Sequence, residues 1–233
     1  VAPKDTLVVL LVGGLGQRMG ELTTNIPKPM LPIGNTPLLE RILQSFALQG
    51  FKDFVLCVNY KSEVIESYFK DGSHLGLRIR YTREETRLGT AGPLALLPEL
   101  PSGPFIVMNG DLVTTANFAH MVDYHSSQKG DLTIATKEHE VLVPFGVVEH
   151  EGAFVSQLIE KPTYNFMTNA GIYILDPNCL EYIPRGSFFD MTELINELLR
   201  KKKRVVNFPI HESWRDIGRP EEYHRTQQDF GHH

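Results

Sequence analysis

Cysteine and tryptophan are scarce in this sequence, with two and one copies respectively in 233 residues. Cys57 and Cys179 are too few and too distant in sequence for a disulfide framework or a cysteine metal site, so we expect buried thiols in a reducing, cytoplasmic compartment.

The longest apolar run, Leu7 to Val12, is far too short to cross a bilayer, and no charged-then-apolar leader precedes it. A formal net charge of −5 argues against non-specific binding to nucleic acid or to a membrane.

Reactive side chains in covalent or metal-binding arrangements are also lacking. No two histidines stand four residues apart on one expected helix face, and no serine or cysteine lies in a nucleophile motif. We therefore expect neither a histidine metal site nor covalent catalysis.

Short apolar runs alternate with helical patterns in the first half of the chain. We expect helices over 36–50, 62–69 and 90–97, and buried strands over 7–12, 54–58, 77–81 and 105–108. This alternation predicts βαβ units, a parallel sheet of the Rossmann-like α/β class, and ligands at the carboxyl ends of its strands.

Strand patterns dominate the second half, with only two helices expected at its end. The expected strands are 131–136, 145–149, 155–159 and 170–175, and the expected helices are 192–200 and 220–229. This part predicts a mixed or antiparallel extension that forms the far wall of a cleft.

A glycine-rich turn, Gly13 to Gly20, follows the first strand and is the strongest local signal. It is not the dinucleotide fingerprint, because Met19 stands where G-x-G-x-x-G needs glycine, and no Gly-Lys-Ser/Thr makes it a P-loop. Backbone amides of such a turn can nevertheless surround a polyphosphate, to which Arg18 adds a planar cation and the proline-flanked Lys28 another. A glycine-rich surface turn with solvated cations remains the alternative.

The loop and the motifs after it resemble those of the sugar nucleotidyltransferases, and most closely the mannose-1-phosphate guanylyltransferases. Gln17 departs from the family's usual threonine, and Gly20 stands where a bulkier residue is common. The matching motifs follow one another in order over nearly the whole chain: Gly13-Gly14-x-Gly16-x-Arg18, Pro27-Lys28-Pro29-Met30-Leu31-Pro32, Leu88-Gly89-Thr90-Ala91-Gly92, Asn109-Gly110-Asp111, Phe145-Gly146-Val147-Val148-Glu149, Ile159-Glu160-Lys161-Pro162, Asn169-Ala170-Gly171 and Trp214-Arg215-Asp216-Ile217-Gly218.

The resemblance implies an enzyme that joins a nucleoside monophosphate from an NTP, GTP being favoured, to a sugar 1-phosphate, mannose 1-phosphate being favoured. The expected partners are these two substrates, the expected cofactor is Mg²⁺, and a homo-oligomer is compatible with the resemblance. One domain, 1–230, would hold a nucleotide half (about 1–130) and a sugar-phosphate half (about 131–230). Residues 231–233 are typical of a tag remnant, and the start without methionine suggests a domain excised from a longer chain.

Each expected site residue takes its role from the resemblance. Arg18 and Lys28 would grip the β- and γ-phosphates, and Lys161 would hold the sugar phosphate. Asp111 and Asp216 would hold the metal. Glu84, just after a strand, would accept two hydrogen bonds from guanine. The remaining expected contacts are Leu11, Gly13, Gly14, Gly16, Gly89 and Thr90 to the nucleotide, and Gly146, Glu160 and Asn169 to the sugar.

Purely structural roles remain as the alternative for several of these residues. Asp111 and Asp216 also fit ordinary turns, Glu160 with Lys161 fits an exposed ion pair, and Glu84 fits a solvated loop charge. For the whole chain, a thymidylyl- or uridylyltransferase and a catalytically silent sugar-nucleotide-binding homologue stay open. The complete charged set favours the enzyme over the silent homologue.

Overall fold

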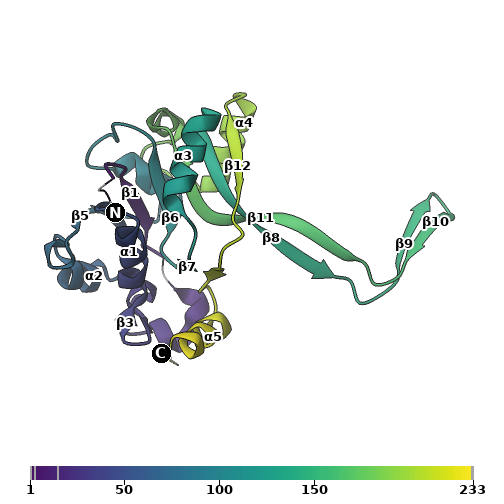
Figure 1. Cartoon of the computed structure of the whole chain (residues 1–233), viewed down its shortest axis with the longest axis horizontal. Coiled ribbons are helices and arrows are strands. Elements are labelled where there is room, and N and C mark those ends of the chain that lie inside the picture. The colour runs from purple at the N-terminus through teal and green to yellow at the C-terminus, as the bar shows by residue number, and fades with distance from the viewer. Residues whose placement is uncertain (1, 3, 15, 232–233) are drawn as a thin grey trace.

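A seven-stranded, mostly parallel sheet forms the centre of the computed structural model, which describes residues 2, 4–14 and 16–231 (Figure 1). Its strand order is β12-β8-β11-β6-β1-β4-β5, and within it only β11 runs antiparallel to its neighbours. The strands are β1 (Val8–Leu11), β4 (Asp53–Val58), β5 (Arg78–Arg83), β6 (Phe105–Asn109), β8 (Leu132–Leu142), β11 (Thr163–Leu175) and β12 (Val205–Pro209).

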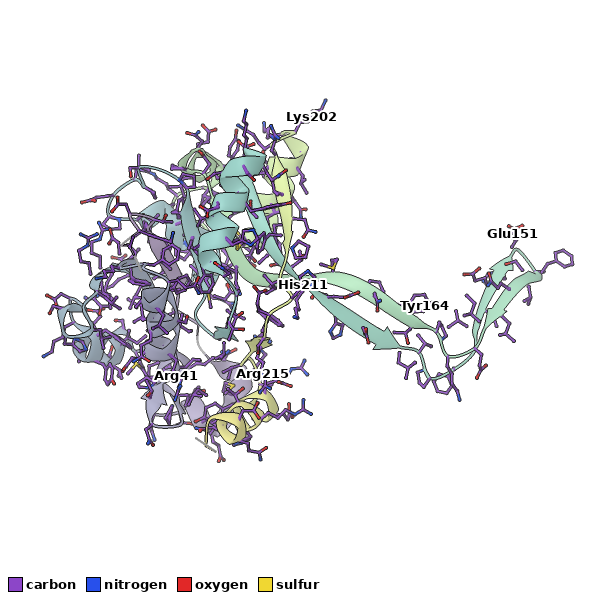
Figure 2. All side chains as sticks on the ribbon, in the orientation of Figure 1. Arg41, Glu151, Tyr164, Lys202, His211 and Arg215 are labelled. Carbon is purple, nitrogen blue, oxygen red and sulfur yellow. The ribbon has the colours of Figure 1, made fainter. Side chains whose placement is uncertain are left out.

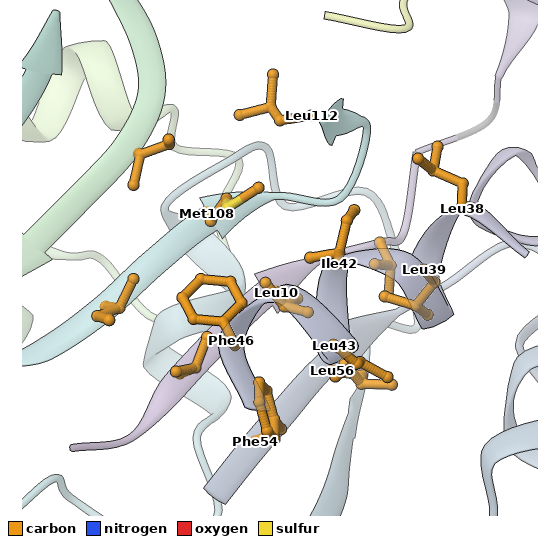
Figure 3. Close-up of a cluster of buried hydrophobic side chains, with 14 of the residues drawn as sticks. Leu10, Leu38, Leu39, Ile42, Leu43, Phe46, Phe54, Leu56, Met108 and Leu112 are labelled. Atoms are coloured by element: carbon orange, nitrogen blue, oxygen red, sulfur yellow. The ribbon is translucent and has the colours of Figure 1, made fainter. Parts of the chain in front are cut away.

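One face of the sheet packs against α1 (Leu38–Leu48), α2 (Ser62–Phe69) and α3 (Phe118–Gln128). Strand residues alternate between faces, so Leu10, Leu56 and Met108 point to this side (Figure 3). Phe46 of α1 lies at the centre of this layer, where its ring stacks on Phe118 at a centroid distance of 3.9 Å. Burial of these side chains is the main force that fixes α1 on the sheet.

The opposite face is covered by α4 (Met191–Arg200) and by the 3₁₀ helices η4 (Gly92–Leu96) and η5 (Pro177–Tyr182). Val9, Val55 and Val107 supply the strand side of this second core. Helices on both faces of a mostly parallel sheet make the three-layer α/β arrangement that the sequence predicts, so this prediction is confirmed.

One expected element needs correction, and two elements were missed. Residues 90–97, expected as a helix, hold only the short η4, because Gly92 and Pro93 disfavour a longer helix. The sequence prediction also missed α3, because its buried face includes the polar His125. Asn117 caps this helix by accepting a hydrogen bond from the His120 amide at 2.9 Å. Edge strand β12 was missed as well.

The expected antiparallel extension is present, but it points away from the sheet. Beyond the sheet, β8 and β11 pair only with each other and lead to the hairpin of β9 (Val147–Glu151) and β10 (Phe154–Ile159) (Figure 1). We call residues 137–169 the arm and the rest of the described chain the body. Figure 2 shows Tyr164 and Glu151 of the arm well away from the body.

The end of the chain returns to the carboxyl edge of the sheet. Strand β13 (Trp214–Asp216) pairs with β7 (Leu112–Thr114), which sets Asp216 opposite Leu112, one residue after Asp111. Helix α5 (Pro220–Gly231) follows, beside η1 (Gln17–Thr23) and β2 (Pro32–Ile33), which pairs with β3 (Thr36–Pro37). Of the expected tag remnant, residues 232 and 233 lie outside the described residues. No described helix combines the length and the apolarity needed to span a bilayer.

Candidate active site

The glycine loop leaves β1 at the carboxyl edge of the sheet and turns sharply into η1. Gly16 has φ +65°, a left-handed conformation that glycine adopts freely, and a side chain there would meet Thr23. The Thr23 hydroxyl donates to the Gly16 carbonyl oxygen at 3.0 Å, which holds the turn closed. The turn at Gly16 is therefore held in place, and Gly14 is open to a ligand, because a side chain there would meet nothing within 4 Å.

Two cavities of about 460 and 280 Å³ adjoin this loop, and because they share six lining residues they form one cleft. Both are lined by Gly13, Gly14, Arg18, Lys28, Arg87 and Asp111. The cleft lies at the carboxyl edge of the sheet, where open α/β sheets bind ligands. Most of the expected nucleotide and phosphate residues meet here: Leu11, Glu84, Gly89 and Thr90 line the smaller cavity, and Gly16 lines the larger one.

An ion pair joins the two charged residues at the floor of the cleft. Lys28 is buried, and its Nζ donates to Asp111 Oδ2 at 2.5 Å. Lys28 is held between Pro27 and Pro29, as the sequence predicts, and Arg18 stands exposed on η1 above it. Arg18, Lys28 and Arg87 thus all face one cleft, and Lys28 forms its ion pair there with Asp111.

Asp216 lies at the rim of the cleft beside Asp111. Its Oδ1 would be 2.8 Å from a side chain at Gly218, which itself lines the larger cavity. The residue is exposed overall, yet nearby protein shields its carboxyl group from water. This shielding and the charge of Asp111 raise the pKa of Asp216, while Lys28 and Arg18 oppose the rise.

The two neighbouring carboxylates fit a hard cation that keeps several waters. Mg²⁺ typically takes one or two protein carboxylates together with substrate phosphates, and repulsion between Asp111 and Asp216 would be relieved by a cation between them. Among the described residues, no cluster of three or more His, Cys, Asp or Glu side chains could hold a metal. The donor set therefore suits an ion shared with phosphate oxygens.

Glu84 reaches into the cleft from the end of β5, half-buried. Its Oε2 accepts from the Leu88 amide at 2.9 Å, and its Oε1 lies 2.8 Å from where a side chain on Gly13 would begin. Burial raises the pKa of Glu84, and the Leu88 hydrogen bond and Arg87 oppose the rise. The carboxylate thus closes the 84–88 loop and presents its second oxygen beside the glycine loop.

A residue that the sequence analysis did not single out, Asp190, fixes the Gly89–Thr90 turn. Asp190 Oδ1 accepts from the Thr90 amide at 2.9 Å and from its hydroxyl at 3.2 Å, and Thr90 Oγ1 accepts from the Met191 amide at 2.7 Å. Gly89 has φ +81°, and a side chain there would lie 2.7 Å from the Phe189 carbonyl oxygen. The Thr90 hydroxyl is thus engaged with the protein.

Arg87 and Asn59 were also missed, although both line the larger cavity. Arg87 packs its guanidinium on the Phe188 ring at 5.6 Å from the centroid, and Asn59 Nδ2 donates to the Glu84 carbonyl oxygen at 3.1 Å. Two features of the sequence could have identified these residues. Arg87 directly precedes the motif that starts at Leu88, and Asn59 directly follows β4, where polar residues reach the carboxyl edge of the sheet.

The expected sugar residues do not meet in the cleft. Gly146, Glu160 and Lys161 lie together on the arm: a side chain on Gly146 would be 3.2 Å from Glu160 Oε2, and Lys161 Nζ is 4.0 Å from Glu160 Oε1. Asn169 lies where the arm leaves the body. Its side-chain Nδ2 donates to the Tyr173 hydroxyl, and its Oδ1 accepts from the backbone amide of Gly171. Within the described residues, neither cavity is lined by any part of the arm.

A Rossmann-like sheet with a glycine loop, basic side chains and the neighbouring Asp111 and Asp216 at its carboxyl edge defines an α/β protein built to bind a polyanion. The family model described as "Nucleotidyl transferase" matches residues 7–232, and the chain belongs to this family. Members of this family generally use a divalent metal.

Individual relatives agree with this assignment. The chain is 33% identical over 223 residues to a mannose-1-phosphate guanyltransferase of Yarrowia lipolytica, covering 92% of this chain and 61% of the relative. It is 34% identical over 230 residues to a mannose-1-phosphate guanylyltransferase of Mycobacterium tuberculosis, covering 95% and 64%. The chain thus spans less than two thirds of the length of these relatives.

Solved structures share the fold over almost their full length. HddC from Yersinia pseudotuberculosis, solved in complex with GMP-PN, has a TM-score of 0.74 at 27% identity, covering 97% of this chain and 99% of that chain. A structure from Bacillus anthracis in complex with a sucrose has a TM-score of 0.77 at 20% identity, which shows the fold alone.

Proposed function

We propose that this chain transfers a nucleoside monophosphate from an NTP to a sugar 1-phosphate and releases pyrophosphate. The observation that carries the proposal is the convergence of the glycine loop, Arg18, Lys28 and Asp111 on one cleft, with Asp216 at its rim. Each of these groups suits a reaction between two polyanions.

The reaction needs positioning and charge neutralisation more than proton transfer. The attacking phosphate oxygen of the sugar 1-phosphate is already anionic near neutral pH, so no general base is required. It approaches the α-phosphorus in line with the departing pyrophosphate. The loop amides and Arg18 stabilise the negative charge that grows on the leaving group, and Lys28 lies beneath the same phosphates.

Asp111 and Asp216 are the residues we assign to a Mg²⁺ ion. When bound, Mg²⁺ neutralises phosphate charge and orients the α-phosphate. Lys28 fixes the Asp111 carboxylate through their 2.5 Å contact, and Asp216 supplies the second carboxylate from β13.

We assign GTP and mannose 1-phosphate as the substrate pair. The names of the relatives from Y. lipolytica and M. tuberculosis and the GMP-PN complex of HddC support a guanine nucleotide. Glu84 offers an acceptor oxygen in the smaller cavity, and guanine presents two adjacent donors, whereas uracil and thymine present one donor between two carbonyl oxygens.

The test is a matrix of nucleoside triphosphates against sugar 1-phosphates, with sugar-nucleotide formation and pyrophosphate release as readouts. GTP with mannose 1-phosphate is expected to react fastest. Fastest reaction with dTTP or UTP would assign a thymidylyl- or uridylyltransferase instead. Nucleotide binding without turnover of any pair would assign a catalytically silent homologue.

A variant pair ties the activity to the cleft. Asp111→Asn keeps the size of the side chain but removes its charge, so turnover should fall by orders of magnitude with the fold intact. Asp53→Asn is the matched control, because Asp53, like Asp111, is half-buried and in an ion pair, here with Arg80, but starts β4 at the opposite edge of the sheet. Full activity of folded Asp111→Asn would refute the metal assignment.

A further inference from the structure

The arm is an amphipathic ribbon that nothing in the body covers. Cross-strand pairing puts Val141 opposite Tyr164 and His139 opposite Phe166 on one face, and Glu140 opposite Asn165 on the other. Such alternation is typical of a sheet with one face buried. Of the seventeen large hydrophobic side chains exposed among the described residues, ten lie in the arm: Val141, Leu142, Phe145, Val148, Phe154, Val155, Leu158, Tyr164, Phe166 and Met167. By the same register, Leu142 and Met167 lie on the face of Glu140. Such a concentration of exposed apolar side chains in one segment marks an interaction site.

A ribbon of two strands is also weak without support. An isolated two-stranded hairpin is only marginally stable in water, and this ribbon runs beyond the last contacts of β8 with β12 and of β11 with β6. Contact with a protein surface would stabilise this ribbon and bury its apolar side chains.

The base of the arm is tied down, so the direction of the arm is fixed. The Lys137 ammonium donates to the carbonyl oxygens of residues 210, 211 and 212 at 3.4, 3.2 and 2.9 Å. Trp214 Nε1 donates to the Ala170 carbonyl oxygen at 2.9 Å. At the adjoining bulge, a side chain on Gly171 would meet Asn109 Nδ2 at 2.6 Å, which leaves no room for the strand to move inward. These contacts therefore set the direction in which the ribbon leaves the body.

The expected sugar-phosphate residues lie midway along the arm, where the β9–β10 hairpin begins and ends. Gly146, Glu160 and Lys161 form a polar cluster there, with the Glu160 and Lys161 side chains 71% and 63% exposed. Asn169, at the base, lies beside the cleft of its own copy, since its neighbour Gly171 approaches Asn109, a lining residue. The eight residues from Asn169 to Lys161 span about 25 Å of strand, so Lys161 is carried far beyond that cleft.

We propose that two copies of this chain exchange arms, so that Glu160 and Lys161 of each copy enter the cleft of the other. A two-fold axis makes the exchange reciprocal: each arm starts beside its own cleft, crosses the axis and completes the partner's. The apolar face of the ribbon then lies on the second body. The proposal deepens the proposed function and rests on it, because Lys161 holds the sugar phosphate across the interface.

The test is complementation between two disabled chains. The Asp111→Asn chain has an inactive cleft and an intact arm, and the Lys161→Ala chain has an intact cleft and an inactive arm. Co-expression with two different affinity tags allows mixed dimers to be isolated by successive captures. With exchanged arms, one of the two sites in each mixed dimer is whole, and about half of the wild-type activity returns.

A matched control pair carries both defects in the cleft. Mixed dimers of Asp111→Asn with Lys28→Ala contain no intact cleft, so they stay inactive however Lys161 acts. Isolated mixed dimers of Asp111→Asn with Lys161→Ala that remain as inactive as this control would overturn the exchange, because Lys161 would then act within its own chain.

A measurement independent of activity separates failure of this proposal from failure of the proposed function. Light scattering should find a dimer of the wild-type chain, and a monomer when 138–167 are replaced by a two-residue turn. The shortened chain should still bind GTP, since the arm lines neither cavity. A monomeric wild type, or a dimer that survives the deletion, would overturn the exchange even if no substrate pair reacts.

Discussion

Asp190 should stabilise the Gly89–Thr90 turn, and its removal offers a direct measure of how much the turn depends on it. Asp190→Ala deletes an ionised acceptor of two hydrogen bonds from Thr90, at 2.9 and 3.2 Å. Bonds to charged groups contribute about 1.5–3 kcal/mol, so we expect a loss near 2 kcal/mol in the free energy of unfolding. For a chain of this length that corresponds to a fall in Tm of about 4–8 °C.

The same change should weaken nucleotide binding, because Thr90 and Asp190 line the smaller cavity. We expect about a tenfold loss of GTP affinity by titration calorimetry, which corresponds to about 1.4 kcal/mol. Asp190→Asn keeps an acceptor oxygen in place and should lose much less. Asn117→Ala, which removes a helix cap far from the cleft, should lower stability by about 1 kcal/mol without changing GTP affinity.

A double-mutant cycle isolates the part of the effect that passes through the Thr90 hydroxyl, because Thr90→Val keeps the backbone amide that also donates to Asp190. If the hydroxyl takes part, Asp190→Ala combined with Thr90→Val should cost clearly less than the sum of the two single changes. Simple additivity would assign the effect to the amide alone, and an Asp190→Ala chain with unchanged Tm and GTP affinity would refute the reasoning.

Two further predictions concern titration and base choice. Burial lowers the pKa of His125, although the charges of Asp176 and Asp131 oppose this shift. The unfolded chain therefore binds a proton on His125 near pH 6.5, whereas the folded chain does not. Below that pH, the free energy of unfolding should fall by up to about 1.4 kcal/mol per pH unit. Urea unfolding at pH 7.5 and 5.5 checks this, and a His125→Gln chain with the same pH slope would contradict it. Glu84→Gln should shift relative rates roughly tenfold from GTP toward UTP or dTTP, since it unpairs a guanine donor; an unchanged preference would leave Glu84 with only its loop contact.

Local sequence patterns predicted the sheet and the charged cleft because both follow from short-range rules. Apolar runs at β1, β4 and β6 are long enough to identify buried strands, and polar residues directly after parallel strands meet at one edge. This rule places Asp111 after β6, whereas the joint role of Arg18 and Lys28 with it was expected from the resemblance to the sugar nucleotidyltransferases.

Contacts between distant segments were beyond that reasoning. Asp190 precedes a helix, where a carboxylate is ordinary, and only the tertiary fold sets it against Thr90, one hundred residues away. The direction of the arm depends on the register of β8 with β11 and on the bonds of Lys137 at its base, none of which leaves a pattern in the sequence. Helix α3 was missed because its buried face includes His125, a polar residue.

The most direct test of the central claim, transfer to a sugar 1-phosphate by attack on the α-phosphorus, follows the attacking oxygen. Mannose 1-phosphate labelled with ¹⁸O in its phosphate group is incubated with GTP, Mg²⁺ and the enzyme, and both products are analysed by mass spectrometry. The account predicts that all of the label stays in the sugar nucleotide and that pyrophosphate carries none. Label in the released pyrophosphate, or pyrophosphate release without any sugar nucleotide, would contradict it.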